Sequence, residues 1–142
     1  MDVFDKIISG EFSSKKVYED DDVLAILDLS QQTKGHTLVI PKKCVKNMLE
    51  IDEETLLKTT KVVHMLCKKL KEKLNCDGFN IVNNCNEVAG QTVPHFHIHI
   101  IPRYKDDNSK LVFINNYDKA NVSDANNEGL YDLDEVLNTI TK

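Results

Sequence analysis

Residues 94–103 read PHFHIHIIPR and contain His95, His97 and His99, three of the five histidines in the chain. Successive side chains of a β-strand point to opposite faces, so these three imidazoles would share one face. The aromatic and β-branched residues between them favour a strand over a helix, and the two flanking prolines suit strand ends. The stretch therefore predicts a strand with an imidazole face and a buried apolar face. The residues of the apolar face are Phe96, Ile98 and Ile100.

Length and composition narrow the class of protein. A chain of 142 residues predicts one domain, with a core large enough to need no disulfide or metal. The net charge of −5 argues against binding nucleic acid through a broad basic face. The four cysteines show no C-x-x-C spacing and are expected to be reduced thiols. Neither a signal peptide nor an apolar run of about 18 residues is present, so we expect a cytoplasmic protein with no membrane partner.

The remaining segments predict an α+β fold with an antiparallel sheet of about five strands and one long helix. Asp52 suits the N-cap of the long helix, because acidic residues follow it and apolar residues then recur at steps of three or four. Helices are predicted within 3–12, 52–74 and 130–140. Strands are predicted at 15–20, 22–29, 36–41, 78–84 and within 94–103. The polar segment 105–129 predicts a surface loop.

Three imidazoles on one strand face have four possible roles: a structural surface, a metal site, nucleophilic catalysis, or ligand binding without turnover. The metal role lacks a carboxylate or cysteine at matching spacing. A neutral imidazole can attack phosphorus, and a pKa of about 6.5 leaves most of it neutral at cellular pH. Gly90, Gln91 and Thr92 precede the strand and offer backbone N–H groups, an amide and a hydroxyl for an oxyanion. This loop favours phosphoryl transfer over metal binding, and the other roles stay open.

The pattern His-φ-His-φ-His-φ-φ, in which φ is apolar, resembles the signature of the histidine triad (HIT) family of nucleotide hydrolases and transferases. Further blocks resemble the family in order and spacing. They are LDLSQQTKGHTLVIPKK at 27–43, GFNIVNN at 78–84 and GQTVPHFHIHIIPR at 90–103. The resemblance covers about residues 3–104, whereas the tail at 105–142 diverges. It implies a HIT-like fold in a single domain spanning 1–142.

The resemblance implies a role for each histidine. His97 occupies the middle position and would attack the α-phosphorus of a nucleotide derivative, giving a nucleotidyl-histidine that water hydrolyses. His95 and His99 would contact the phosphate oxygens, and His36 matches a fourth active-site histidine. The chemistry favours a backbone carbonyl that holds the second ring nitrogen of the nucleophile. The transferase branch commonly carries glutamine where this chain has His99, so hydrolysis is favoured over transfer.

The resemblance also implies a nucleotide-binding set. Asp28 matches the carboxylate that holds the ribose hydroxyls, and Asn84, rather than Asn83, matches the phosphate-site asparagine. The phosphate and leaving-group site would further contain Gly90, Gln91 and Thr92. The apolar residues of the base slot, which could equally be ordinary core, would be Phe4, Ile7, Leu27 and Leu29.

Some bacterial relatives bind zinc through a C-x-x-C pair near the N-terminus and later histidines. In this chain Asp2 and Asp5 take the cysteine positions, and Cys44 takes one histidine position. Carboxylates near a chain end offer little of the preorganisation that a structural site needs, so this set, with His95, predicts no structural zinc. The site itself requires no metal cofactor, although a polyphosphate substrate can bring Mg²⁺.

The leading functional prediction is a nucleotidyl hydrolase acting on purine nucleoside phosphoramidates or dinucleoside polyphosphates. The alternative is a nucleotide-binding regulatory or interaction protein with incidental hydrolysis. The resemblance further implies a homodimer formed through the long helix and an adjoining edge strand.

Overall fold

The computed structural model describes residues 1–107 and 132–141. The chain divides into two compact units, of which the first contains the sheet and all five histidines. The second contains helix α4 (Leu133–Thr141), which is the predicted C-terminal helix and exposes Leu137 and Ile140. Most of the predicted 105–129 loop lies outside the described residues, and the single-domain organisation stays a prediction. Within the described ranges, no helix has the length and apolar character that crossing a membrane requires.

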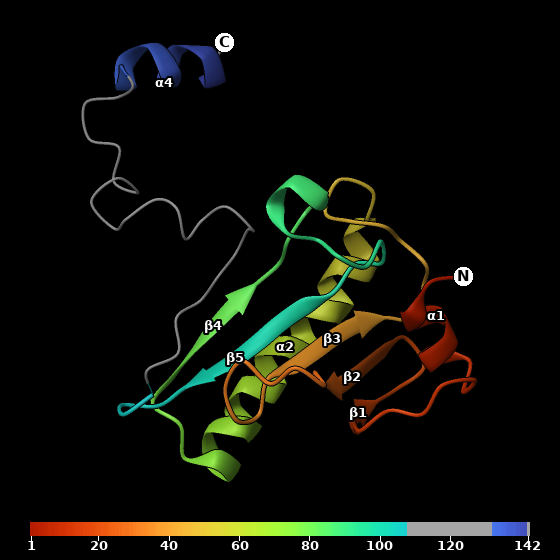
Figure 1. Ribbon diagram of the computed structural model, residues 1–142. Coiled ribbons are helices and arrows are strands. Elements are labelled where there is room, and N and C mark those ends of the chain that lie inside the picture. Colours follow the sequence, from red (N-terminus) through yellow and green to blue (C-terminus); the bar gives the residue numbers. More distant parts are fainter. Residues whose placement is uncertain (108–131, 142) are drawn as a thin grey trace. The chain divides into compact units, whose positions relative to one another are not determined.

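Five strands form one antiparallel sheet in the order β1-β2-β3-β5-β4 (Figure 1). The strands are β1 (Lys16–Glu19), β2 (Val23–Leu27), β3 (Thr37–Pro41), β4 (Gly78–Val82) and β5 (Ile98–Arg103). This confirms the predicted α+β fold. Because β5 lies between β3 and β4, the last strand of the described residues carries the histidine segment into the interior of the sheet.

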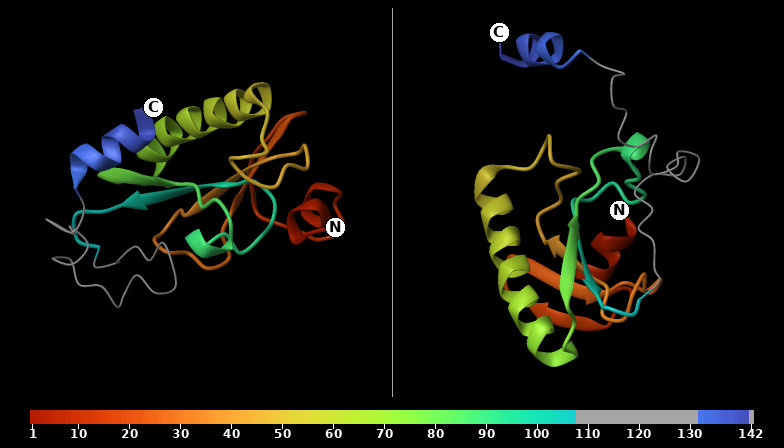
Figure 2. Two further views of the ribbon diagram at one scale, coloured as in Figure 1. Left: turned by 90° about the horizontal axis from the view of Figure 1, so that it is seen from above. Right: turned by 90° about the vertical axis from the view of Figure 1, so that its left-hand side faces the viewer.

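Helix α2 (Glu53–Leu74) covers one face of the sheet (Figure 2). The side chain of Asp52 accepts a hydrogen bond from the Thr55 N–H, as the predicted N-cap should, and Asn75 ends the helix in the left-handed region. The buried side chains between α2 and the sheet form the main core. Burying each Leu or Ile side chain there stabilises the fold by about 1.5–3 kcal/mol. Its members include Val23, Ala25, Val39, Val62, Val63, Leu66, Leu70, Phe96, Ile98 and Ile100.

Helix α1 (Val3–Ile8) packs against the opposite face of the sheet through the buried ring of Phe4. A reciprocal capping box starts this helix. The Asp5 N–H donates to Asp2 Oδ1 (2.9 Å), and the Asp2 N–H donates to Asp5 Oδ2 (3.2 Å). Both carboxylates are therefore held in fixed positions at the start of the chain. The strand residues of this smaller core are Leu24, Ile26, Leu38 and Ile40.

The histidine strand is shorter than the sequence predicts. Strand β5 begins at Ile98, so His95 and His97 lie in the segment that enters it. The Phe96 N–H donates to the Val45 carbonyl (2.8 Å) instead of to a sheet neighbour, which takes this segment out of the ladder. The predicted division into two faces nevertheless holds, because the predicted apolar residues all lie in the main core.

Candidate active site

The ring of His97 is only 6% exposed and lies beside Phe4 and His99, with ring centroids 4.9 Å and 5.0 Å away. Its Nδ1 is 2.8 Å from the carbonyl oxygen of His95. A carbonyl oxygen only accepts, so Nδ1 carries the hydrogen and Nε2 keeps its lone pair. The backbone contact that the chemistry favours is therefore present, and it makes Nε2 the nucleophilic atom.

His99 has the opposite tautomer, which two hydrogen bonds establish. The backbone N–H of Gln32 donates to His36 Nδ1 (3.1 Å), so the hydrogen of a neutral His36 is on Nε2. His36 Nε2 lies 3.0 Å from His99 Nδ1, which must accept. The hydrogen of His99 is therefore on Nε2. Two adjacent rings thus offer a lone pair on His97 and an N–H donor on His99.

Burial keeps these rings uncharged. It lowers the pKa of His97 below the ordinary histidine value. Burial, together with the neighbouring His97 and His36, lowers the pKa of His99 to about 4. Burial also lowers the pKa of His36, although the nearby Asp28 carboxylate opposes the shift. At neutral pH the site therefore contains neutral imidazoles, the form that nucleophilic attack requires.

Asp28 and His36 face each other because Leu27 and Thr37 pair in register at the ends of β2 and β3. Asp28 Oδ2 lies 3.6 Å from His36 Nε2, which is beyond hydrogen-bond range. Asp28 Oδ1 accepts from the Ser30 N–H (2.8 Å). The Asp28 side chain is 22% exposed, so Oδ2 remains accessible to a ligand hydroxyl at the edge of the site.

The loop after β4 contributes a residue that the sequence analysis does not assign. Asn83 Nδ2 donates to the His97 carbonyl (2.9 Å) and so fixes the backbone of the nucleophilic residue. Asn84, the residue that the resemblance favours, is half-buried, and its side chain has no hydrogen bond within the described part of the chain. Val82 pairs with His99, so the antiparallel register, carried further, sets Asn83 opposite Ile98 and Asn84 opposite His97. The register alone therefore does not single out Asn83, whose contact with the His97 carbonyl is visible only in the structure.

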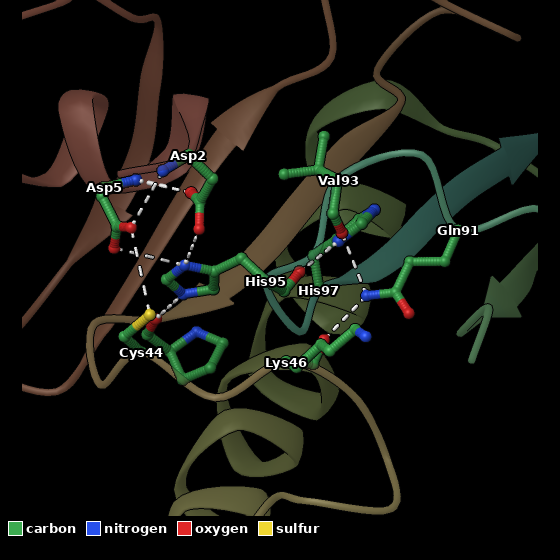
Figure 3. Close-up of polar contacts among 9 residues, drawn as sticks. Asp2, Asp5, Cys44, Lys46, Gln91, Val93, His95 and His97 are labelled. Atoms are coloured by element: carbon green, nitrogen blue, oxygen red, sulfur yellow. Dashed lines mark hydrogen bonds and ion pairs between the residues drawn. The ribbon is translucent and has the colours of Figure 1, made fainter. Parts of the chain in front are cut away.

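The buried side chain of Gln91 braces the loop (Figure 3). Its Nε2 donates to the Lys46 carbonyl (2.7 Å) and the Val93 carbonyl (3.0 Å), and its Oε1 accepts from the Asn86 N–H (2.8 Å). Since these bonds occupy the amide, a Gln91 contact with phosphate would require one of them to break, and such a contact stays a prediction. Thr92 beside it is exposed.

The predicted base-slot residues differ in exposure. Phe4 is 5% exposed and belongs to the smaller core, so it packs against His97 rather than lining an open surface. Leu29 is 93% exposed, whereas Ile7 and Leu27 are half-buried. Leu29 is therefore the base-slot residue that a nucleotide base could cover. Gly90, in the loop before the histidine segment, has a φ of 96°, a conformation that favours glycine.

Two groups of possible metal ligands each include one triad histidine. Asp2, Asp5, Cys44 and His95 each place one donor atom within 4.8 Å of the others (Figure 3). The second group, with the same spacing, consists of Asp28, His36 and His99.

Solved structures of similar sequence share this fold. A HIT family protein from Bacillus anthracis is 38% identical, with a TM-score of 0.75 over 99% of this chain and 96% of that chain. A zinc-bound histidine triad family protein from Mycobacterium smegmatis is 37% identical, with a TM-score of 0.74 over 77% of this chain and 79% of that chain.

These findings correct one expectation. The sequence analysis rejects structural zinc because carboxylates near a chain end lack preorganisation. In the structure, the capping box fixes Asp2 and Asp5, and Cys44 and His95 converge on them. With a zinc-bound relative at 37% identity, the rejection of zinc is not supported.

Related sequences agree with the structures. An uncharacterised HIT-like protein of Methanocaldococcus jannaschii is 46% identical over 140 residues, which are 99% of this chain and 98% of that protein. An adenylylsulfatase of Arabidopsis thaliana is 38% identical over 105 residues, 74% of this chain and 53% of that protein. The model of the HIT domain matches residues 9–106, which contain all three triad histidines. The chain therefore belongs to the HIT domain family.

Proposed function

We propose that the protein is a nucleotidyl hydrolase that cleaves purine nucleotide derivatives at the α-phosphorus through a nucleotidyl-His97 intermediate. The observation that carries the proposal is the pair of opposite tautomers, with a lone pair on His97 Nε2 and an N–H on His99 Nε2. Adjacent rings of this kind supply a nucleophile and a hydrogen-bond donor for the charge that develops in the reaction. The relative that is named an adenylylsulfatase supports an adenylyl substrate.

In the first step His97 Nε2 attacks the α-phosphorus, an N–P bond forms, and the bond to the leaving group breaks with its electron pair going to the leaving atom. The ring becomes positively charged, and the hydrogen bond from Nδ1 to the His95 carbonyl stabilises that charge. The His99 N–H donates a hydrogen bond to a phosphate oxygen or to the leaving atom and stabilises the charge that develops there, and the leaving group takes its proton from solvent water. One such positioned donor contributes about 10²- to 10³-fold to the rate.

In the second step water attacks the same phosphorus and gives a proton to solvent, the N–P bond breaks with its electron pair returning to His97 Nε2, and a nucleoside monophosphate leaves. Proximity and orientation within the half-buried site provide much of the acceleration. The two steps involve imidazoles and backbone amides only, so we propose that they need no metal cofactor. A dinucleoside polyphosphate would bring its own Mg²⁺.

The nucleotide would lie across the ends of β2 and β3. Asp28 Oδ2 would accept from the ribose hydroxyls, and the exposed Leu29 would cover one side of the base. The phosphate would meet Asn84, Gly90, Gln91 and Thr92, with Gln91 acting through the loop that it braces.

A homodimer is the second part of the proposal. Strand β4 lies at one edge of the described sheet, and its Ile81 side chain is 49% exposed. Helix α2 exposes Leu57 and Met65 on its outer surface. An open strand edge with apolar residues beside it is a surface that a second copy can cover. Sedimentation of dilute protein as a single 16 kDa species would contradict this part.

The reaction is tested by incubating the protein with adenosine 5′-phosphoramidate and, separately, with diadenosine tetraphosphate. Chromatography of the products, with His97→Ala as control, shows which leaving group is accepted. Fast AMP release from the phosphoramidate identifies an amine leaving group, whereas preferential cleavage of the dinucleotide identifies a polyphosphate. If neither substrate turns over faster than with the variant, hydrolysis of these classes is wrong. Micromolar nucleotide binding without turnover would then favour the regulatory alternative.

A further inference from the structure

The side chain of Gln31 bridges the two ends of the loop between β2 and β3. Its Nε2 donates to the carbonyl oxygens of Asp28 (2.5 Å) and His36 (2.8 Å), and its Oε1 accepts from the Gly35 N–H (2.8 Å). A carbonyl oxygen only accepts and a backbone N–H only donates, so these partners fix the orientation of the amide. One side chain therefore holds the backbone of the proposed ribose carboxylate together with that of an active-site histidine.

The outer part of this loop has anchors of its own. The Thr33 hydroxyl donates to the Pro102 carbonyl (2.5 Å), and the Tyr104 hydroxyl donates to the Lys34 carbonyl (2.7 Å). These two bonds attach the outer part of the loop to the end of β5 and the residue after it. Gln31 instead closes the loop upon itself. A change of its amide should therefore act on the ends of the loop rather than on its attachment to β5.

The residue after Gln31 connects this brace with the chemistry. The backbone N–H of Gln32 donates to His36 Nδ1 (3.1 Å) and so places the hydrogen of His36 on Nε2. His36 Nε2 donates in turn to His99 Nδ1 (3.0 Å), which leaves the hydrogen of His99 on Nε2. Because Gln31 directly precedes Gln32, fixing its side chain directs the Gln32 N–H at the His36 ring.

We propose that Gln31 is a positioning residue for the reaction, and that its amide selects the tautomer of His99. Without the brace, the Gln32 N–H can turn away from the His36 ring, which can then hold its hydrogen on either nitrogen. The other tautomer of His36 presents a lone pair to His99 Nδ1, which must then carry the hydrogen itself. His99 Nε2 would face the substrate with a lone pair instead of an N–H. The effect on catalysis rests on the proposed hydrolase function, whereas the tautomer is a property of the chain.

His97 provides an internal comparison, because its tautomer has a different origin. Its Nδ1 donates to the carbonyl oxygen of His95, which lies in the segment that enters β5 rather than in the loop that Gln31 braces. General damage to the site would affect both rings. Loss of the brace should change His99 and leave His97 as it is, so comparing the two rings separates positioning from a general loss of structure.

NMR of the ring nitrogens tests the proposal directly, because a nitrogen that carries hydrogen and one with a lone pair have different chemical shifts. Gln31→Glu is the sharpest variant. It keeps the length and the acceptor for the Gly35 N–H, but it replaces both donated hydrogen bonds by contacts between oxygens. At neutral pH the two His99 nitrogen shifts should be well separated in the native chain and should converge in Gln31→Glu, as two tautomers mix. The His97 shifts should stay unchanged.

Lys34→Ala is the matched control, because it removes an exposed side chain from the same loop and keeps the carbonyl that Tyr104 binds. It should keep the native shifts of both rings. Gln31→Met, which removes the three hydrogen bonds at a similar length, should repeat the pattern of Gln31→Glu. Native His99 shifts in both Gln31 variants would overturn the proposal, and so would equal changes in His97 and His99.

Kinetics provide a second readout. Gln31→Glu should lower kcat for adenosine 5′-phosphoramidate by about 2- to 10-fold, the equivalent of one net hydrogen bond, and Lys34→Ala should match the native chain. Gln31→Glu combined with His36→Leu should lose no more kcat than His36→Leu alone, since the brace acts through that ring. Additive losses would overturn this route. A native chain without turnover would contradict the hydrolase proposal alone, because the NMR shifts report the tautomer without turnover.

Discussion

His36 Nε2 lies 3.0 Å from His99 Nδ1, and this contact determines which nitrogen of His99 carries the hydrogen. The Gln32 N–H holds the far side of the His36 ring. His36 therefore acts on the reaction through His99, as a positioning residue. Substitutions at His36 should consequently affect the hydrogen bond that His99 donates to the reacting groups more than nucleotide binding.

We expect His36→Leu to lower kcat by about 10- to 100-fold with little change in KM, because it removes part of a hydrogen-bond contribution of about 10²- to 10³-fold to the developing charge. His36→Gln should retain more activity, since its amide N–H can still donate to His99 Nδ1. Steady-state kinetics with a phosphoramidate and with a p-nitrophenyl nucleotide ester provide the measurement. The loss should be larger for the amine leaving group, which develops less stabilised charge than p-nitrophenolate. Equal losses on both substrates would argue against a hydrogen bond from His99 to the leaving group.

The two asparagines after β4 should separate structural support from substrate binding. Asn83→Ala removes the hydrogen bond to the His97 carbonyl, so we expect about 1–2 kcal/mol lower free energy of unfolding and a lower kcat. Asn84→Ala should raise KM and leave stability unchanged. Urea unfolding and steady-state kinetics of both variants check this. If Asn84→Ala is the variant that loses stability, the two assignments are reversed.

Local sequence patterns predicted the two faces of the histidine segment and the elements around it. Alternation with a period of two separates Phe96 from His97 without knowledge of the neighbouring strands. Alternation of this kind involves only a few neighbouring residues, so it can be predicted from the sequence without a structure. The proximity of Asp28 and His36 is different, because it follows from the pairing of β2 with β3 across the loop between them, and both residues were assigned from the resemblance.

Contacts between distant segments could not be predicted in the same way. Asn83 reaches the His97 carbonyl only because the end of β4 lies beside the segment that enters β5, and Gln91 is occupied because its loop packs on the backbone of Lys46. The failed rejection of zinc has the same origin. The capping pattern of Asp2 is visible in the sequence, but its approach to His95 joins residues 93 positions apart.

The pH dependence of kcat/KM should reflect the lowered pKa values. Because the pKa of His97 lies below the ordinary value of about 6.5, the neutral nucleophile should persist as pH falls through that value. We expect a flat profile between pH 8 and about pH 6.5, and a decrease only at lower pH, with His99 remaining neutral down to about pH 4. Initial rates with a substrate that does not titrate in this range give the profile. A decrease centred at or above pH 6.5 would contradict it.

Asp28 should discriminate ribose from its dideoxy analogue. A hydrogen bond to a charged group contributes about 1.5–3 kcal/mol, so Asp28→Asn should lower kcat/KM for an adenosine substrate by about 10- to 100-fold. The 2′,3′-dideoxy substrate should lose much less, because it has no hydroxyl to bind. Competition kinetics with both substrates measure this. Equal losses with the two substrates would mean that Asp28 acts through His36 and does not bind the ribose hydroxyls.

The most direct test of the central claim compares His97→Ala with His64→Ala, an exposed histidine on α2 that serves as control. Turnover is measured with adenosine 5′-phosphoramidate, and AMP binding is measured by calorimetry. If His97 Nε2 is the nucleophile, His97→Ala should lose about 10⁴-fold or more in kcat while still binding AMP, and His64→Ala should match the native chain. Native-level turnover by His97→Ala would contradict the account.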